Sequence, residues 1–115
     1  LAFSPLAAGL LTGKYQGGAV PDGSRMSLNA ELGGRKTERA FDAVDAYLSL
    51  AQAYGLDPVQ MALAWCRQRP FMGSVIFGAT NMDQLELAIG AGDLDLPDQV
   101  IRAIDDAHRS HPFPY

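Results

Sequence analysis

Two stretches decide the fold: LAFSPLAAGLLTGKY at residues 1–15 and SVIFGATNMDQLELAI at residues 74–89. Each opens with a short, mostly apolar run, residues 1–4 and 74–77, without the alternation of a half-exposed strand. Such runs are typical of parallel strands that are buried on both faces. Pro5 ends the first run because it removes a backbone donor, and Gly78 follows the second. Each run therefore predicts a short buried strand.

Helices are predicted around these strands. Residues 6–14 predict a helical turn followed by loop, and residues 16–36, rich in Gly, Ser, Asn and Pro, predict a long loop. Loops beyond about 12–15 residues are usually functional lids or disordered. Two helices are expected within residues 37–70, the second capped by Asp57 with Gln60 in the capping-box position. Asn81 and Gln84 repeat that pattern at the start of the helix that ends the 74–89 stretch, and a last helix covers residues 97–109.

The order of elements is strand, loop, helix, helix, strand, helix, helix, which indicates an α/β fold with a parallel sheet. Two parallel strands alone would leave unpaired edges and uncovered faces. The chain also starts with Leu1 inside an apolar segment rather than with Met. We therefore expect a piece of a larger α/β sheet or barrel.

Composition excludes several classes of protein. The 115 residues carry 13 acidic and 9 basic side chains, for a net charge of -4, which argues against a nucleic-acid partner. No apolar run approaches the ~20 residues of a membrane span. The single cysteine, Cys66, fits a reducing cytoplasm and is expected to be a core thiol. His108 and His111 offer too few ligands for a metal site.

Both decisive stretches could bind an anion. The glycine-rich turn after the first strand offers backbone N–H donors next to Lys14, and the helix that follows Gly78 presents its N-terminus to the second strand's carboxyl end. The alternatives are a plain glycine turn and an ordinary strand-to-helix connection. In (β/α)₈ barrels this carboxyl face carries the active site, commonly with a phosphate site after the last two strands.

The two motifs, in this order and spacing, resemble the aldo-keto reductase family, in particular its Tas-like and potassium-channel β-subunit-like branch. The resemblance covers essentially the whole chain. It implies the last two βα units and the final helix of a (β/α)₈ TIM barrel, and an NADP(H) site. The ligands implied on the nicotinamide and pyrophosphate side are Ser4, Pro5, Leu6, Ala8 and Gly9. Those implied for the phosphates are Lys14 and Arg25, and those for the adenosine half are Gly78, Thr80 and Gln84.

The resemblance implies a parent enzyme that reduces a small aldehyde or ketone by hydride transfer from NADPH. The family's catalytic Tyr, Lys, Asp and His lie in the first half of the barrel, so no catalytic residue is expected in this chain, and Lys14 and Tyr15 do not take those roles. Leu87 and Ala88 stand where the family often has a polar residue followed by an adenine-contacting Asn. Two alternatives remain: a non-catalytic NADP-binding regulatory subunit, and a truncated protein that self-associates through its open sheet edges.

Overall fold

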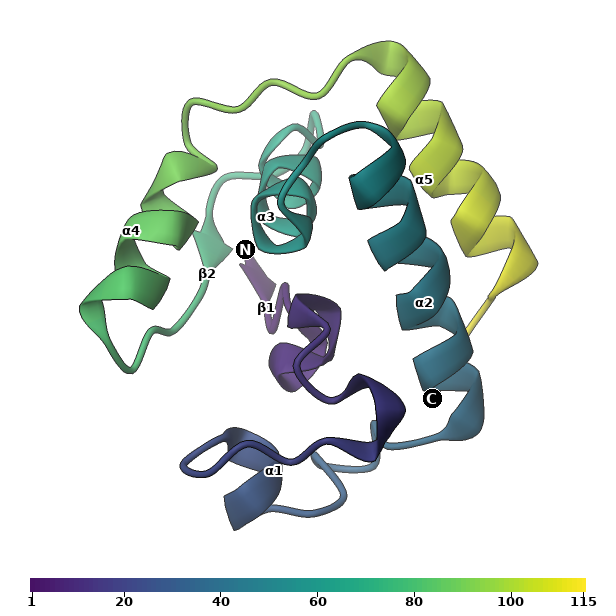
Figure 1. Cartoon of the computed structure of the whole chain (residues 1–115). Coiled ribbons are helices and arrows are strands. Elements are labelled where there is room, and N and C mark those ends of the chain that lie inside the picture. The colour runs from purple at the N-terminus through teal and green to yellow at the C-terminus, as the bar shows by residue number, and fades with distance from the viewer.

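The computed structural model describes residues 1–115 as a helix-rich chain around one small parallel sheet (Figure 1). The sheet consists of β1 (Ala2–Phe3) and β2 (Val75–Ile76). Two 3₁₀ helices follow β1, and five α-helices complete the chain: η1 (Ala7–Thr12), η2 (Gln16–Gly18), α1 (Arg25–Leu28), α2 (Glu38–Ala53), α3 (Pro58–Arg67), α4 (Met82–Gly90) and α5 (Asp98–Ser110).

The two strands are parallel neighbours, and helices connect the end of β1 to the start of β2. Ala2 pairs with Val75 and Phe3 with Ile76. Helix α3 precedes β2 and packs against it, against η1 and against its neighbours α2 and α4. In Figure 1, α4 lies on one side of α3, while α2 and α5 pack together on the other. An α/β chain with a parallel sheet is therefore confirmed.

Helices α2, α3 and α4 begin with side-chain caps at the positions where the sequence predicts helix starts. The side chains of Thr37, Asp57 and Asn81 accept backbone N–H bonds at the first turns of α2, α3 and α4. The capping boxes differ from the prediction. Gln60 Nε2 donates a 3.0 Å hydrogen bond to the Leu87 carbonyl and so links α3 to α4. The Gln84 side chain accepts from Thr80 rather than from the Asn81 N–H.

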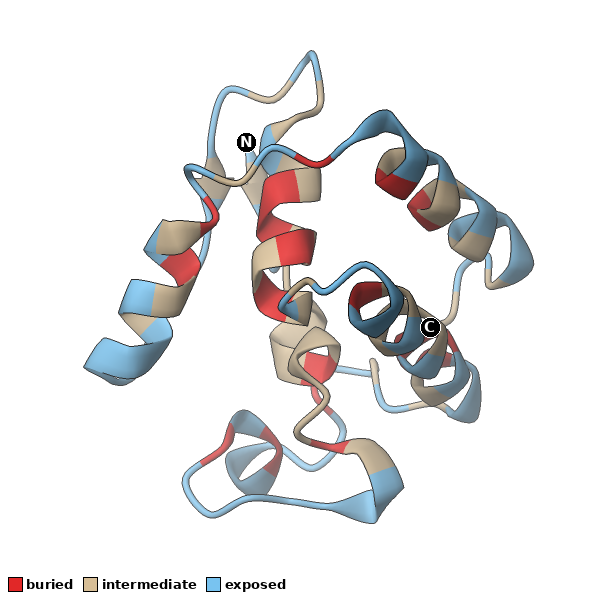
Figure 2. Cartoon of the chain, turned by 45° about the horizontal axis from the view of Figure 1, so that its top comes forward, coloured by how far each residue is buried: buried red, intermediate tan, exposed pale blue.

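Three apolar clusters form the core, and Figure 2 shows their buried residues on the inward sides of the helices. The first joins the segment after β1 to α2 and contains Leu10, Tyr15, Met26, Leu32, Ala40 and Val44. The second lies between α2, α3 and α5 and contains Ala51, Met61, Ala64, Leu96, Val100 and Ile104. The third joins α3 to α4 and contains Val59, Leu63, Ala88 and Ala91.

Two predictions from the sequence need correction. The strands are not buried: Phe3 is 76% exposed and Ile76 52% exposed, because each strand has only the other as a neighbour. Residues 16–36 are not wholly irregular, since they contain η2 and α1. This segment packs against the first cluster because its residues Met26 and Leu32 are buried there.

Candidate functional site

The candidate site lies at the carboxyl ends of the two strands. Because Phe3 is in register with Ile76, Ser4 leaves β1 beside the point where Phe77 leaves β2. In open parallel sheets and barrels, ligands bind outside this edge, where loops replace the strands. The segments that begin at Ser4 and at Gly78 therefore start from one edge of the sheet.

The backbone after β1 adopts an uncommon left-handed conformation. Ser4, Ala7 and Ala8 have φ values of 53°, 50° and 59°, and Gly9 follows at 97°. A left-handed conformation costs a non-glycine residue roughly 1–2 kcal/mol, so the surrounding structure must hold these residues in place.

This conformation leaves backbone donors free. The N–H of Ala7 donates to the Ser4 carbonyl, and those of Gly9 and Leu11 donate to the Leu6 carbonyl. The N–H groups of Leu6 and Ala8 have no acceptor within the chain. Free N–H groups on a left-handed turn are typical of anion-binding concavities.

The Lys14 side chain lies over this turn. A Cβ atom added at Gly9 would come within 3.1 Å of Lys14 Cε and 3.3 Å of Lys14 Nζ. The Thr12 hydroxyl donates to the Gly9 carbonyl at 2.7 Å and accepts the Lys14 N–H at 3.2 Å. Because Gly9 has no side chain, the Lys14 ammonium can approach its backbone closely. The two Thr12 hydrogen bonds fix the turn that places this ammonium over Gly9.

Tyr15 connects the turn to α1. Its side chain is fully buried, and its hydroxyl accepts a 3.2 Å hydrogen bond from the Met26 N–H. Arg25, the residue before Met26, is exposed at the start of α1 and makes no hydrogen bond or ion pair with another predicted ligand. The structure therefore brings Lys14 to Gly9, whereas no hydrogen bond or ion pair joins the Arg25 side chain to either.

The segment after β2 is held only by local contacts. The side-chain Oε1 of Gln84 accepts hydrogen bonds from the Thr80 N–H at 2.9 Å and from the Thr80 hydroxyl at 3.0 Å. Both residues and Gly78 are exposed, and a Cβ added at Gly78 would meet no atom within 4 Å. Thr80 and Gln84 are thus paired, and the backbone at Gly78 faces open space.

Sequence reasoning missed two residues that shape the site, Thr12 and Tyr15. A hydroxyl two residues before Lys14 is a signal for a local side-chain turn, which could have identified Thr12. An aromatic residue at the start of a glycine-rich loop was the signal for Tyr15, but its partner, the Met26 N–H, is eleven residues away.

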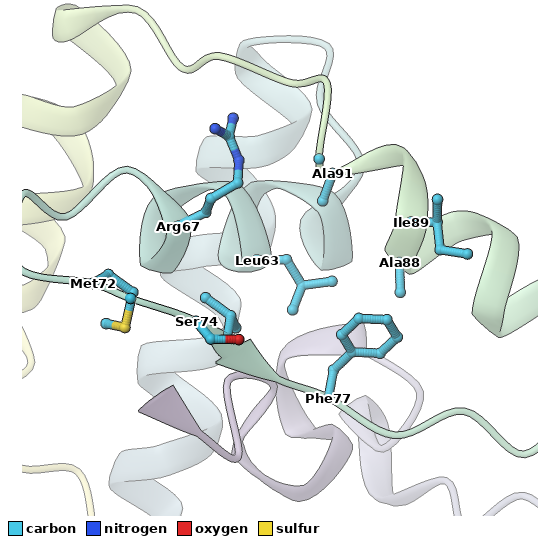
Figure 3. A pocket seen from close by; sticks show the side chains of 11 residues that line it. Leu63, Arg67, Met72, Ser74, Phe77, Ala88, Ile89 and Ala91 are labelled. Carbon is cyan, nitrogen blue, oxygen red and sulfur yellow. The ribbon is translucent and has the colours of Figure 1, made fainter. Parts of the chain in front are cut away.

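A separate apolar groove of about 310 Å³ lies between α3, β2 and α4 (Figure 3). Leu63, Phe77 and Ala88 point into it, with Met72 and Ile89 at its sides. None of the predicted cofactor ligands lines this groove. Ala88 is buried against α3.

Other reactive groups are not activated. Burial raises the pKa of the Cys66 thiol, and the Arg69 charge offsets this only in part. Burial, together with the Asp105 carboxylate, raises the pKa of Tyr47. No three or more His, Cys, Asp or Glu side chains gather as a metal site would require. No helix has both the length and the apolar character needed to span a membrane.

Comparison with known proteins gives a consistent result. A family model described as "Aldo/keto reductase family" matches residues 1–109. The chain is 43% identical to Protein tas of Escherichia coli over 114 residues, which is 99% of this chain and 33% of that protein. A probable voltage-gated potassium channel subunit beta of Arabidopsis thaliana is 38% identical, covering 80% of this chain and 29% of that protein.

An uncharacterized oxidoreductase of Mycobacterium bovis is 36% identical over 110 residues, covering 96% of this chain and 33% of that protein. The chain thus spans about a third of the length of the curated relatives it matches.

Proposed function

Because the chain belongs to the aldo/keto reductase family, we propose that it forms the C-terminal, NADP(H)-binding part of an oxidoreductase that reduces small aldehydes or ketones. The observation that carries this proposal is the left-handed turn after β1, which has free Leu6 and Ala8 N–H groups and the Lys14 side chain over its Gly9. Backbone donors and one cation over a glycine form a donor set that suits a phosphate.

The open sheet supports a larger barrel as the setting of this site. Both strands have a free edge, and the apolar groove beside β2 exposes Phe77 to solvent. Parallel strands occur almost only in sheets covered on both faces. We infer that β1 and β2 are the last two strands of a (β/α)₈ barrel and that the rest of the longer protein covers the edges and this groove.

We assign each predicted ligand a role in binding NADP(H). Ser4, Pro5, Leu6, Ala8 and Gly9 would hold the nicotinamide and pyrophosphate side through the turn at the carboxyl end of β1. Lys14 and Arg25 would hold phosphate charge, including the 2′-phosphate that distinguishes NADP from NAD. Gly78, Thr80 and Gln84 would contact the adenosine half, with the open backbone at Gly78 allowing close approach.

The residues of this chain bind and orient and do not transfer protons. When bound, the nicotinamide supplies a hydride to the substrate carbonyl. Tyr15 is buried with its hydroxyl against the Met26 N–H, and Lys14 lies over Gly9, so neither is placed as an acid for a carbonyl. The acid that protonates the substrate oxygen would come from the part of the longer protein that this chain lacks.

A non-catalytic regulatory subunit is the second candidate. The similarity to proteins named as potassium channel β subunits favours it. Such a subunit would keep the nucleotide site, so the residues described above would have the same binding roles. Only turnover separates the two functions.

The test is a titration of the longer protein with NADPH, followed by an assay of NADPH oxidation with a panel of aldehydes and ketones. Binding with turnover is the expected result, and binding without turnover would favour the regulatory subunit. Absence of NADPH binding would contradict both functions. The isolated 115-residue chain is expected to give no turnover, and activity in a preparation free of the longer protein would place catalytic groups within this chain.

A further inference from the structure

Tyr15 occupies an unusual place in the candidate site. It belongs to the first core cluster and has no exposed surface, although it lies at the start of a glycine-rich segment. A buried phenol hydroxyl normally has a hydrogen-bond partner, and here the partner is the Met26 N–H at 3.2 Å. One side chain therefore fixes a backbone atom eleven residues further along the chain.

The ring of the same residue touches the turn after β1. A Cβ added at Gly9 would lie 3.4 Å from Tyr15 Cε2, and the Lys14 ammonium lies 5.2 Å from the ring centroid. A cation within about 6 Å of an aromatic ring is attracted to its face. The ring thus supports both the glycine of the turn and the cation above it.

The Tyr15 hydroxyl is one of the few groups that hold helix α1. This helix has only four residues, and its N-cap, Ser24, makes no side-chain capping bond. Isolated helices shorter than about 12–15 residues are marginal in water. Gly17, Gly18 and Gly23, all at positive φ, lie between Tyr15 and α1. The hydrogen bond to Met26 therefore constrains where α1, and Arg25 at its start, are held, beside the burial of the Met26 side chain in the first cluster.

We propose that Tyr15 is a positioning residue that holds the two phosphate-binding cations together, Lys14 through its ring and Arg25 through the Met26 N–H. The proposal rests on the proposed function, because that function assigns both cations to the phosphates of NADP. Tyr15 does not touch the nucleotide. It keeps α1 close to the turn, so that Arg25 need not be ordered when the nucleotide binds.

The test is Tyr15→Phe in the longer protein, which keeps the ring and removes the hydroxyl. Loss of one hydrogen bond predicts NADPH binding weakened about threefold to tenfold. NADH binding should change less, because NADH lacks the 2′-phosphate. Trypsin should cleave after Arg25 faster than in the wild type, since α1 loses its anchor. Tyr54→Phe is the matched control: Tyr54 is partly exposed at the end of α2, and the variant should behave as wild type in all three measurements.

The outcomes separate the two proposals. Equal losses for NADPH and NADH, or unchanged cleavage after Arg25, would show that Tyr15 only fills the core and would overturn the positioning role. Wild-type protein that bound neither nucleotide would overturn the proposed function instead, and the positioning role with it. A selective loss of NADPH binding with faster cleavage supports the proposal.

Discussion

The segments that follow the two strands begin at the same edge of the sheet but are held in different ways. After β1, left-handed backbone at Ala7 and Ala8 is fixed against a cluster that includes the fully buried Leu10 and Tyr15. After β2, Gly78, Thr80 and Gln84 are exposed and are held by hydrogen bonds within four residues. The first segment is supported by the core, and the second by local bonds alone.

This difference shows which segment affects both the binding of a ligand and the stability of the fold. Strained backbone persists only where packing over-determines it, so the turn after β1 depends on the same contacts that stabilise the fold. An exposed, locally capped segment can change without disturbing the core. Substitutions after β1 should therefore affect folding or phosphate binding strongly, whereas those after β2 should have smaller effects.

The largest effect is expected for Leu10→Ala. Leu10, in η1, is almost fully buried in the first cluster, which also contains Ala40 and Val44 of α2. Truncation of a buried leucine costs about 2–5 kcal/mol of unfolding free energy. Met82→Ala, at a 64% exposed position after β2, is the control and should change it by less than about 0.5 kcal/mol. Denaturant unfolding of the longer protein measures the free energy of unfolding of both variants. Similar losses in the two variants would contradict the difference between the segments.

A smaller effect, on binding rather than folding, is expected for Lys14→Ala. A charge-assisted contact with phosphate is worth roughly 1.5–3 kcal/mol, so NADPH affinity should fall about tenfold to a hundredfold. NADH affinity should fall much less, and the midpoint of unfolding should barely move. Fluorescence titration with both nucleotides measures the loss of NADPH affinity relative to the loss of NADH affinity. Equal losses would assign Lys14 to the shared pyrophosphate, and no loss for either would show that it only lies in solvent.

The smallest effect is expected for Asn81→Ala after β2. Its side chain accepts the Gln84 N–H at 2.9 Å and caps α4. Loss of a cap costs about 0.5–2 kcal/mol. The exposed position favours the lower part of that range, and Asn81→Ser, which can still cap, should restore most of it. A loss as large as that of Leu10→Ala, measured by the same unfolding experiment, would mean that this segment is also part of the core.

Local chemistry made much of this fold predictable. Thr37, Asp57 and Asn81 start helices in the structure, and Gly55 follows α2 in a left-handed conformation that glycine adopts readily. These features depend on a few neighbouring residues. The parallel order of the strands also followed from the alternation of strands and helices.

Features that depend on distant contacts could not be predicted. No local rule places alanines such as Ala7 and Ala8 in left-handed backbone, since glycine normally fills such positions. Burial of Tyr15 depends on Met26, Leu32 and α2, which are far along the chain. Exposure of Phe3 and Ile76 follows from the absence of neighbouring strands rather than from their own composition.

Hydrogen exchange of the longer protein with and without NADPH tests most directly whether the two strand ends form one nucleotide site. We predict slower exchange of backbone amides in residues 4–14 and 78–84 at the same nucleotide concentration, with no change in α5. The protection should include the Leu6 and Ala8 N–H groups, which have no acceptor within the chain. Protection of only one segment, or protection confined to α5, would contradict the account.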